Sequence, residues 1–439
     1  MLQYKINTHA FYSVIKKVFL LCLFVAYSVF SINKSWNDDF RAYYQAGRHI
    51  LSSANVYDRN VVEGGFLYSP FFALLMVPLS YLPQITAATL WYFTNIASLL
   101  LALILGLYFN ERTAQPVMSW LKTASQDRRL KLILLLSMGL SAKFWLNSIE
   151  HGQVNLHLLA LVLIAIYSLK KQRVLIGSLF LGTATVIKIL PGLFLFYFLL
   201  RRQYRFVVLS IFWITLFIFL PGLILGWHVN CNLLAAWFHK TIGATLIEGM
   251  IGTGDSNQSV PAMLARFLSN VPAQEKTGAS VNFLSLSAQT VDIIIKVSSL
   301  LFLLAIAISA RLLNQKALNA TEKINSRENL ALSLVFLTSA LLPPHTWKAY
   351  FVTSIMAYTT VVCTLTKKRY NKSRRLFILL LATSFGLHTL TSDGIWGWNL
   401  AYFFQSYSCI TVSMLLLYFA VLMMLLKQSL ERSRTVGIA

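Results

Sequence analysis

Two adjacent carboxylates, Asp38 and Asp39, come shortly after the first hydrophobic segment of the chain. Acidic residues are scarce, since only 15 of the 439 residues are Asp or Glu whereas 38 are Lys or Arg. A carboxylate beside an apolar segment therefore calls for an explanation more than a basic residue does. One explanation is catalytic, because a carboxylate can take the proton from a hydroxyl group as that group attacks an electrophile.

Helical geometry limits what this pair can do. Residues 39–51 place apolar side chains on one helical face and polar side chains on the other, which is typical of an amphipathic helix at a membrane interface. Consecutive side chains on a helix diverge by about 100°, so Asp38 and Asp39 do not both face one site. Asp38 stands where a residue caps a helix or favours its positive end. A structural role for both carboxylates is the alternative.

The composition indicates a membrane protein. Hydrophobic residues make up 57% of the chain and charged residues 12%, and apolar runs of about 15 to 25 residues recur along it. The net charge of +23 would suit nucleic acid only if basic residues clustered on one folded surface, whereas here they follow the loops. We therefore expect an all-α polytopic membrane protein with about twelve transmembrane helices and no nucleic-acid partner.

The expected spans are residues 15–33, 86–109, 131–147, 154–169, 174–189, 191–200, 206–226, 287–310, 329–343, 350–366, 375–391 and 405–426. Residues 68–83 contain three prolines and are better explained as a re-entrant or surface helix than as a full span. The first apolar run lacks a small-residue cleavage site, so we interpret it as a retained signal anchor. The four cysteines show no CxxC or metal-binding spacing.

The loop charges predict the orientation in the membrane. Most of the 38 Lys and Arg residues fall in segments on the same side as the N-terminus, and most acidic residues fall on the other side. Cytoplasmic loops carry such a basic excess. We therefore expect both termini in the cytoplasm and an active site on the outer, periplasmic or extracellular face of a bacterial plasma membrane.

Two long outer segments divide the chain. We expect a catalytic transmembrane module over residues 1–226, which includes the outer segment 34–85. The second large outer loop follows over residues 227–286, and C-terminal transmembrane helices occupy residues 287–439. Chemistry is expected between the two outer segments.

Several short motifs, taken in order, resemble those of glycosyltransferase family 87, the polyprenyl-phosphate-mannose-dependent mannosyltransferases of the GT-C fold. The matching motifs are Asp39-Phe40, Tyr43-Tyr44, Val56-Tyr57, Tyr68-Ser69-Pro70, Gly152-Gln153-Val154-Asn155, Ile187-Lys188-Ile189-Leu190-Pro191, Asn257-Gln258-Ser259 and Pro344-His345-Thr346-Trp347. Each motif is short, but their order and topological placement make the combination fairly specific. They cover most of the chain to about residue 350.

The resemblance implies a polyprenyl-phosphate-linked sugar donor, usually mannose, a glycolipid or glycan acceptor, and an inverting transfer at the outer face. In this fold the first outer loop carries a catalytic Asp, and the matching position here is Asp39. A single displacement needs such a base, and the leaving phosphate needs cations or hydrogen-bond donors. No cofactor is expected. A divalent metal on Asp38 and Asp39 would need ligands from elsewhere in the chain.

The residues that would hold the donor phosphate are basic side chains expected near the outer face. Lys188 is the first candidate, because an ionisable residue in a hydrophobic run indicates function, although snorkelling toward lipid head groups is the alternative. His345 is the second candidate. His151, Arg266 and Lys348 also lie on expected outer loops, where solvated or head-group positions are the alternative.

Amides and one aromatic residue complete the predicted substrate site. Gln153 and Asn155 either bind sugar hydroxyl groups or satisfy the backbone of a short turn. Asn257 and Gln258 leave the same choice, and Asn257 is also placed to begin a helix. The membrane belt explains most outer aromatic residues, with Trp347 as the exception that lies inside a motif.

Two other classes of function stay open at this stage. A transporter or flippase of lipid-linked glycans would also have many helices and an intramembrane lysine, but such folds usually show paired repeats and broken helices near the midplane. This chain instead concentrates polar residues at one face. A glycan polymerase or ligase shares the lipid chemistry, and the sequence does not separate it from a transferase.

Overall fold

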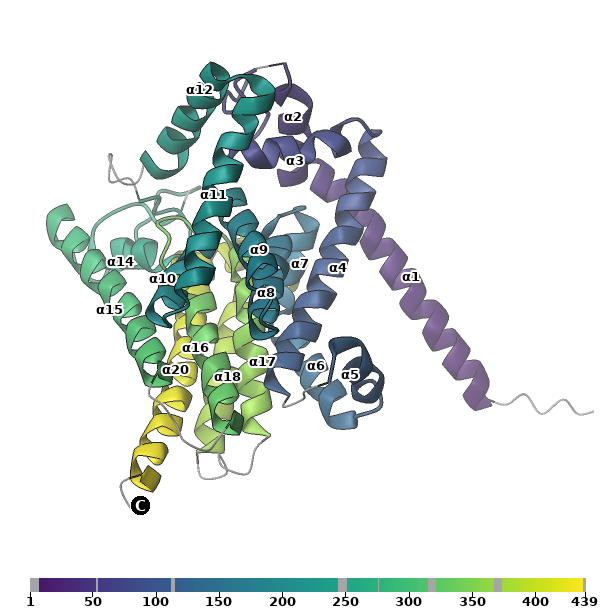
Figure 1. Cartoon of the computed structure of the whole chain (residues 1–439), viewed down its shortest axis with the longest axis vertical. Coiled ribbons are helices and arrows are strands. Elements are labelled where there is room, and N and C mark those ends of the chain that lie inside the picture. The colour runs from purple at the N-terminus through teal and green to yellow at the C-terminus, as the bar shows by residue number, and fades with distance from the viewer. Residues whose placement is uncertain are drawn as a thin grey trace, which may run out of the picture.

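The computed structural model describes residues 8–52, 54–111, 115–243, 251–274, 276–314, 321–366 and 373–436. Over these residues the chain consists of helices and connecting loops, which confirms the all-α class (Figure 1). The helices are α1 (Thr8–Trp36), α2 (Asp39–Ile50), α3 (Pro70–Ser80), α4 (Gln84–Asn110), α5 (Val117–Ala124), α6 (Arg128–Leu140), α7 (Ala142–Glu150), α8 (Asn155–Lys170), α9 (Val174–Ile187), η1 (Leu190–Gly192), α10 (Leu193–Leu200), α11 (Tyr204–Leu225), α12 (Trp227–Phe238), η2 (His239–Gly243), α14 (Val260–Leu268), α15 (Ala288–Asn314), α16 (Thr321–Leu341), η3 (Lys348–Thr353), α17 (Ser354–Leu365), α18 (Arg374–Leu390), α19 (Asp393–Ser406) and α20 (Cys409–Val436).

A polytopic membrane protein is confirmed, but twelve spans are not. Among the described residues, six helices are long and apolar enough to cross a membrane, and the number reaches eight if the bent pairs α6–α7 and α18–α19 each count as one span. Three expected spans form the short helices α8, α9 and α10, of 16, 14 and 8 residues. A helix needs about 20 residues to cross the hydrocarbon layer, so none of these crosses it alone.

The short proline-containing helix of the first long segment is confirmed as α3. Ser69 begins it, because the Ser69 side chain accepts a hydrogen bond from the backbone N–H of Phe72. Pro70 then occupies the first helical position, where its missing N–H costs nothing. The result is a helix of 11 residues that packs under α2 rather than crossing the membrane.

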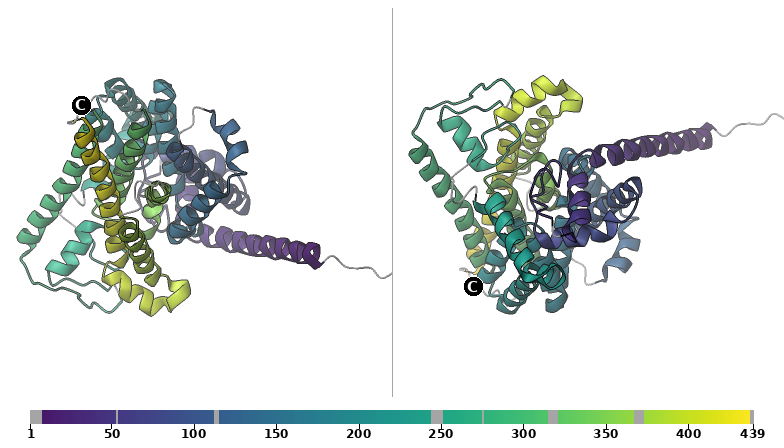
Figure 2. Two further views of the ribbon diagram at one scale, coloured as in Figure 1. Left: turned by 90° about the horizontal axis from the view of Figure 1, so that it is seen from below. Right: turned by 90° about the horizontal axis from the view of Figure 1, so that it is seen from above.

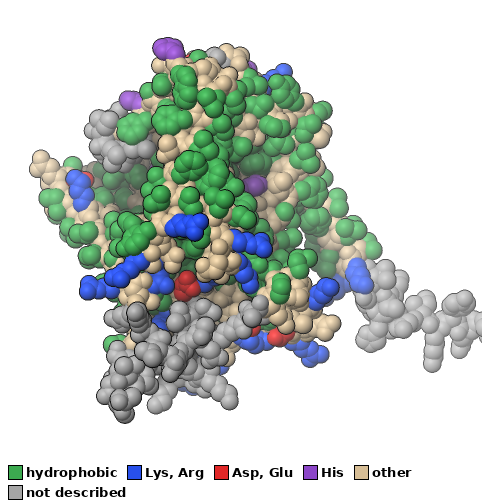
Figure 3. All heavy atoms as spheres, in the orientation of Figure 1, with side chains coloured by type: hydrophobic (Ala, Val, Ile, Leu, Met, Phe, Trp, Pro, Cys, Tyr) green, Lys and Arg blue, Asp and Glu red, His purple; other side chains and the backbone are tan. Residues whose placement is uncertain are grey.

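α2, α3 and α12 lie together at one end of the molecule, called here the α2 face (top of Figure 1). Seen from above, α2 and α12 lie over the middle of the helical bundle, and the yellow-green α19 lies at its edge (Figure 2, right). α1 extends away from the bundle, and its apolar side chains, such as Phe19 and Phe30, are exposed as a lipid-facing helix requires. Most Lys and Arg side chains visible in Figure 3 gather below the broad apolar surface, toward the opposite end.

The expected amphipathic helix after Asp38 is confirmed as α2, and its apolar face packs against protein. Its side chains Phe40, Tyr43 and Ile50 are at most 1% exposed. Phe40 stacks on Trp91 of α4 with ring centroids 5.5 Å apart, and a Cβ at Gly47 would lie 2.7 Å from the backbone of Met76 in α3. Buried aromatic pairs and close helix contact therefore hold α2 as a fixed part of the protein core.

Candidate functional site

A cavity of about 500 Å³ lies where the two long segments and the loop before η3 meet. This size is typical of a small-molecule site. The lining residues are Asp39, Tyr43, Gly65, Leu67, Tyr68, Gln153, Ile187, Lys188, Ile189, Leu190, Trp237, Lys240, Thr241, Pro343, Pro344, His345, Trp347 and Tyr350. Asp39, Lys188, His345, Trp347 and Gln153 are thus brought together as predicted.

The two carboxylates bind one turn, but only one of them lines the cavity. The side-chain amide of Gln153 donates a hydrogen bond to Asp39, while the Asp38 carboxylate pairs with Nδ1 of His151. Asp38 occupies the N-cap position of α2, yet its side chain makes no capping hydrogen bond. The capping prediction for Asp38 is therefore corrected, since His151 engages the carboxylate instead.

Gly152 allows this turn to lie directly on the start of α2. Its φ of +61° lies in the left-handed region. A Cβ at this position would lie 2.7 Å from Cβ of Phe40 and 2.9 Å from Cβ of Ser35. The Gly152 carbonyl also accepts a 2.7 Å hydrogen bond from Nε1 of Trp91. The contact between the turn and α2 leaves no room for a side chain.

Asp39 is set up as a base near neutral pH. Burial raises the pKa of the Asp39 carboxyl to about 7, and the negative charge of Asp38 adds to this rise. Electrostatic interactions with His151 and Lys188 oppose this rise. A general base works best when its pKa lies near the operating pH, so this environment suits proton transfer.

Lys188 reaches the cavity from a break between two helices. α9 ends at Ile187, Lys188 is extended, and Pro191 lies in the next short turn, η1. The Nζ of Lys188 donates a 3.0 Å hydrogen bond to Oδ1 of Asn155, and it lies 3.2 Å from the ring centroid of Tyr350. The ammonium group therefore faces protein atoms inside the site, which argues against snorkelling.

A second cation in the cavity, Lys240, escaped the sequence analysis. Its Nζ donates a 2.7 Å hydrogen bond to the carbonyl of Tyr57, so it ties η2 to the first long segment. The side chain lines the cavity together with Trp237. The only signal in the sequence was a lysine near Trp237 and Phe238 in the second long segment, and such lysines are common at membrane surfaces.

Arg266, Asn257 and Gln258 were predicted to contact the substrate, but their side chains bind protein groups behind the cavity lining. Arg266 is fully buried, and its guanidinium donates hydrogen bonds to the backbone carbonyls of Thr253, Gly254 and Asn257 and to Oγ of Ser408. These four hydrogen bonds satisfy the two terminal nitrogens of the buried guanidinium, whereas its Nε has no hydrogen-bond partner among the described residues. Arg266 is therefore a structural residue rather than a phosphate ligand.

Asn257 and Gln258 are likewise structural. The Asn257 side chain donates to the carbonyl of Pro344 at 2.8 Å and accepts from the N–H of Thr346 at 2.9 Å, so it clamps the backbone on both sides of His345. Gln258 donates to the carbonyls of Asp255 and Gln405. Both amides lie outside the cavity lining, and the substrate contacts predicted for them are corrected.

His151, Lys348 and Asn155 also lie outside the lining of the main cavity. His151 is engaged by Asp38, and Lys348 sits at the start of η3 beyond Trp347. The Asn155 side chain lies behind Gln153 and Lys188 and links these two residues through two 3.0 Å hydrogen bonds. The structure therefore does not bring these three residues into the main cavity with Asp39 and Lys188.

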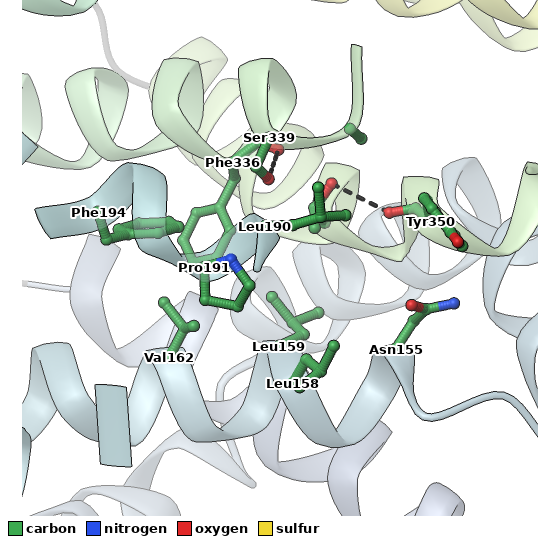
Figure 4. A pocket seen from close by; sticks show the side chains of 12 residues that line it. Asn155, Leu158, Leu159, Val162, Leu190, Pro191, Phe194, Phe336, Ser339 and Tyr350 are labelled. Atoms are coloured by element: carbon green, nitrogen blue, oxygen red, sulfur yellow. Dashed lines mark hydrogen bonds between the residues drawn. The ribbon is translucent and has the colours of Figure 1, made fainter. Parts of the chain in front are cut away.

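A small apolar crevice of about 40 Å³ adjoins the cavity and shares Leu190 and Tyr350 with it (Figure 4). Asn155 and Tyr350 stand at one end of the crevice, and apolar side chains such as Phe194 and Phe336 gather at the other end. The polar main cavity and the apolar crevice therefore lie next to each other.

In the parts of the chain that the structure describes, no group of three His, Cys, Asp or Glu side chains is placed to hold a metal ion.

Comparison with known proteins gives a family match that covers part of this site, including Lys188 and Lys240 but not Asp39 or His345. The model of glycosyltransferase family 87 matches residues 66–326, more than half of the chain. An alpha-(1->3)-arabinofuranosyltransferase of Corynebacterium glutamicum is 28% identical over 187 residues, which are 42% of this chain and 41% of that protein.

Two mannosyltransferases give similar matches. The polyprenol-phosphate-mannose-dependent alpha-(1-2)-phosphatidylinositol pentamannoside mannosyltransferase of Mycolicibacterium smegmatis is 28% identical over 203 residues, 46% of this chain and 44% of that protein. The polyprenol-phosphate-mannose-dependent alpha-(1-2)-phosphatidylinositol mannoside mannosyltransferase of Mycobacterium tuberculosis is 28% identical over 207 residues, 46% of this chain and 45% of that protein. The chain spans less than half the length of the curated relatives it matches.

Replacing Gly152 by alanine tests the contact between the turn and α2. The added Cβ meets Phe40 and Ser35 at a left-handed φ, so Gly152→Ala should lower the stability of the folded protein by about 1–3 kcal/mol. Thermal unfolding of the purified protein in detergent measures this loss. Gly139→Ala is the matched control, because a Cβ there meets nothing within 4 Å in helix α6. An unchanged unfolding temperature for Gly152→Ala would contradict the tight contact.

Proposed function

The chain belongs to glycosyltransferase family 87, and we propose that it acts as a membrane glycosyltransferase that moves one sugar from a polyprenyl phosphate to a lipid or glycan acceptor. Mannose is the proposed sugar, because two of the three relatives carry polyprenol-phosphate-mannose in their names. The proposed active site lies on the α2 face, turned toward the outside of the cell. The Lys and Arg side chains toward the opposite end support this orientation.

One observation carries the proposal, namely the convergence of a carboxylate and two ammonium groups on one cavity. Asp39, Lys188 and Lys240 come from three segments far apart in the sequence and line the same space of about 500 Å³. A phosphate-linked sugar needs this combination, with cations for the phosphate and a base for the attacking hydroxyl group. The polar cavity beside an apolar crevice also suits a ligand that joins a phosphate to a hydrocarbon chain.

The proposed reaction is a single displacement at the anomeric carbon. The acceptor hydroxyl oxygen forms a bond to that carbon while the bond from the carbon to the phosphate oxygen breaks. Asp39 takes the hydroxyl proton, and the polyprenyl phosphate leaves with the electron pair of the broken bond. Lys188 and Lys240 stabilise the charge that grows on this phosphate. The reaction needs no cofactor, because the phosphate ester already activates the sugar.

Aromatic and imidazole side chains line the remainder of the cavity and would bind the sugar. His345 and Trp347 lie on the same loop with ring centroids 5.6 Å apart, and Trp237 contributes from α12. Flat rings pack against the apolar faces of a sugar. The Asn257 side chain holds this loop through hydrogen bonds to the backbone of Pro344 and Thr346. This arrangement favours a sugar ring between Asp39 and the 343–350 loop.

Asp39→Asn should abolish sugar transfer, because the amide keeps the shape of the side chain but does not accept the proton. A loss of at least about a hundredfold in kcat is expected, the usual contribution of a general base. The assay is transfer of labelled mannose from a polyprenyl-phosphate donor by the purified protein. Full activity of Asp39→Asn would exclude Asp39 as the base. Movement of intact lipid-linked glycan across vesicles without sugar transfer would favour a flippase.

The pH dependence of kcat/KM should follow the titration of Asp39. The carboxyl holds its proton below its pKa of about 7, so activity should rise with pH up to about neutrality and then level off. Asp38→Asn removes a negative neighbour, lowers the pKa of Asp39 and should move this acid limb to lower pH. Glu63→Gln, which removes an exposed carboxylate paired with Arg41, should leave the limb in place. An acid limb that stays fixed in Asp38→Asn would contradict the assignment.

Lys188→Gln and Lys240→Gln should weaken use of the donor. Each replacement removes a charged contact to the phosphate, worth about 1.5–3 kcal/mol or roughly a tenfold to hundredfold rise in donor KM. The exposed Lys276 is the matched control, since Lys276→Gln removes a positive charge without touching the cavity. Donor KM values that change equally in all three variants would indicate only a general effect of charge.

A further inference from the structure

A second pair of lysines, Lys143 and Lys348, lies outside the cavity in a region to which the mechanism assigns no role. Lys143 stands at the start of α7 and Lys348 at the start of η3, two helices that pack against each other. The Nζ of Lys143 donates a 3.1 Å hydrogen bond to Oγ of Ser392. Lys348 makes no hydrogen bond or ion pair with any residue that the structure describes. The two half-buried ammonium groups act on each other electrostatically.

The surrounding acidic groups do not fully neutralise this pair. Glu150 is bound by Lys34 at 2.8 Å, and Asp255 interacts with Arg266. Asp393 acts on both lysines, but it lies beyond ion-pair distance from each of them among the described contacts. Two half-buried cations therefore share one carboxylate. Keeping like charges together away from water is costly, so such lysines lose a proton more readily unless an anion joins them.

The position of the pair suits the head group of a lipid. Ser392 precedes α19, which bends by 85° from α18, and α19 exposes Trp396 and Trp398. Exposed tryptophans are typical of the membrane–water interface, where head-group phosphates lie. The two lysines are half-buried beside this helix, so a phosphate at interface depth would reach them without entering the hydrocarbon layer.

The pair is also coupled to the proposed active site through both helices that carry it. Lys348 follows Trp347, which lines the cavity. Lys143 lies on α7, and α7 leads into the turn that holds Asp39. Along α7 the distance from Lys143 to the end of the helix is about 10 Å. The two lysines therefore lie on elements that also help to form the cavity.

We propose that Lys143 and Lys348 form a second anion-binding site, outside the donor cavity, that holds the phosphate of a lipid head group. The two ammonium groups contact the phosphate oxygens, and the Ser392 hydroxyl group adds a donor. The assignment of this lipid as the sugar acceptor rests on the proposed function. The binding of its phosphate does not.

The test is protection of lysines from reductive methylation in the full-length protein in detergent, read residue by residue by peptide mass spectrometry. Dihexanoyl phosphatidylglycerol is the probe, at a concentration ten times its dissociation constant. Methylation of Lys143 and Lys348 should slow by about tenfold, since the free fraction falls to about one tenth. The exposed Lys276 should react at an unchanged rate in the same sample.

Two further probes identify the source of the anion. Inorganic phosphate at the same concentration and uncharged dihexanoylglycerol should each give little protection. Equal protection by inorganic phosphate would replace the lipid with a free phosphate ion and overturn the proposal as stated. Equal protection by dihexanoylglycerol would show that acyl chains alone cover the lysines, and it would overturn the proposal too.

Variants show whether the two lysines act as one site. Lys348→Gln should remove most of the protection of Lys143, whereas Lys276→Gln should not. Protection of Lys143 that persists in Lys348→Gln would contradict a shared site. The inactive Asp39→Asn protein should show full protection, so failure of the proposed reaction and failure of this site give different results.

Discussion

The seating of the turn at residues 151–153 on the first residues of α2 is the contact on which the site depends. Gly152 lies so close to Phe40 and Ser35 that only a glycine fits. The same turn binds Asp38 through His151 and Asp39 through Gln153, so one backbone contact fixes both carboxylates. Buried aromatic side chains hold α2 in place. The protein core, rather than a mobile loop, therefore fixes the position of Asp39.

The hydrogen-bonded chain behind the turn explains how a base and a cation share one cavity without neutralising each other. Lys188 binds Asn155, Asn155 binds Gln153, and Gln153 binds Asp39. Two amides thus separate the ammonium group from the carboxylate. Lys188 lowers the pKa of Asp39 only as a minor influence, while burial keeps it near 7. Under the proposed function, this spacing leaves Lys188 free for the phosphate and Asp39 free for the proton.

The sequence was informative where a local motif carries the chemistry. Asp39 and Lys188 were predicted to share a site because each stands in a short motif at a predictable place along the membrane helices, and both line one cavity. Arg266 was misassigned because a buried structural guanidinium and a phosphate-binding one look alike until their hydrogen-bond partners are known. Lys240 was missed because it reaches the site only through its contact with Tyr57, a long-range pairing. The count of twelve spans is not confirmed, because apolar runs that look alike in the sequence form helices of different lengths, such as α9 and α10 with 14 and 8 residues.

The central claim is that the cavity between Asp39, Lys188 and Lys240 binds the phosphate of a polyprenyl donor. An electron cryo-microscopy structure of the full-length protein with bound polyprenyl phosphate measures this directly. The account predicts phosphate density in contact with the Nζ atoms of Lys188 and Lys240, with the first part of the lipid near Leu190. Phosphate density that is found only outside this cavity, for example at the opposite end of the molecule, would contradict the claim.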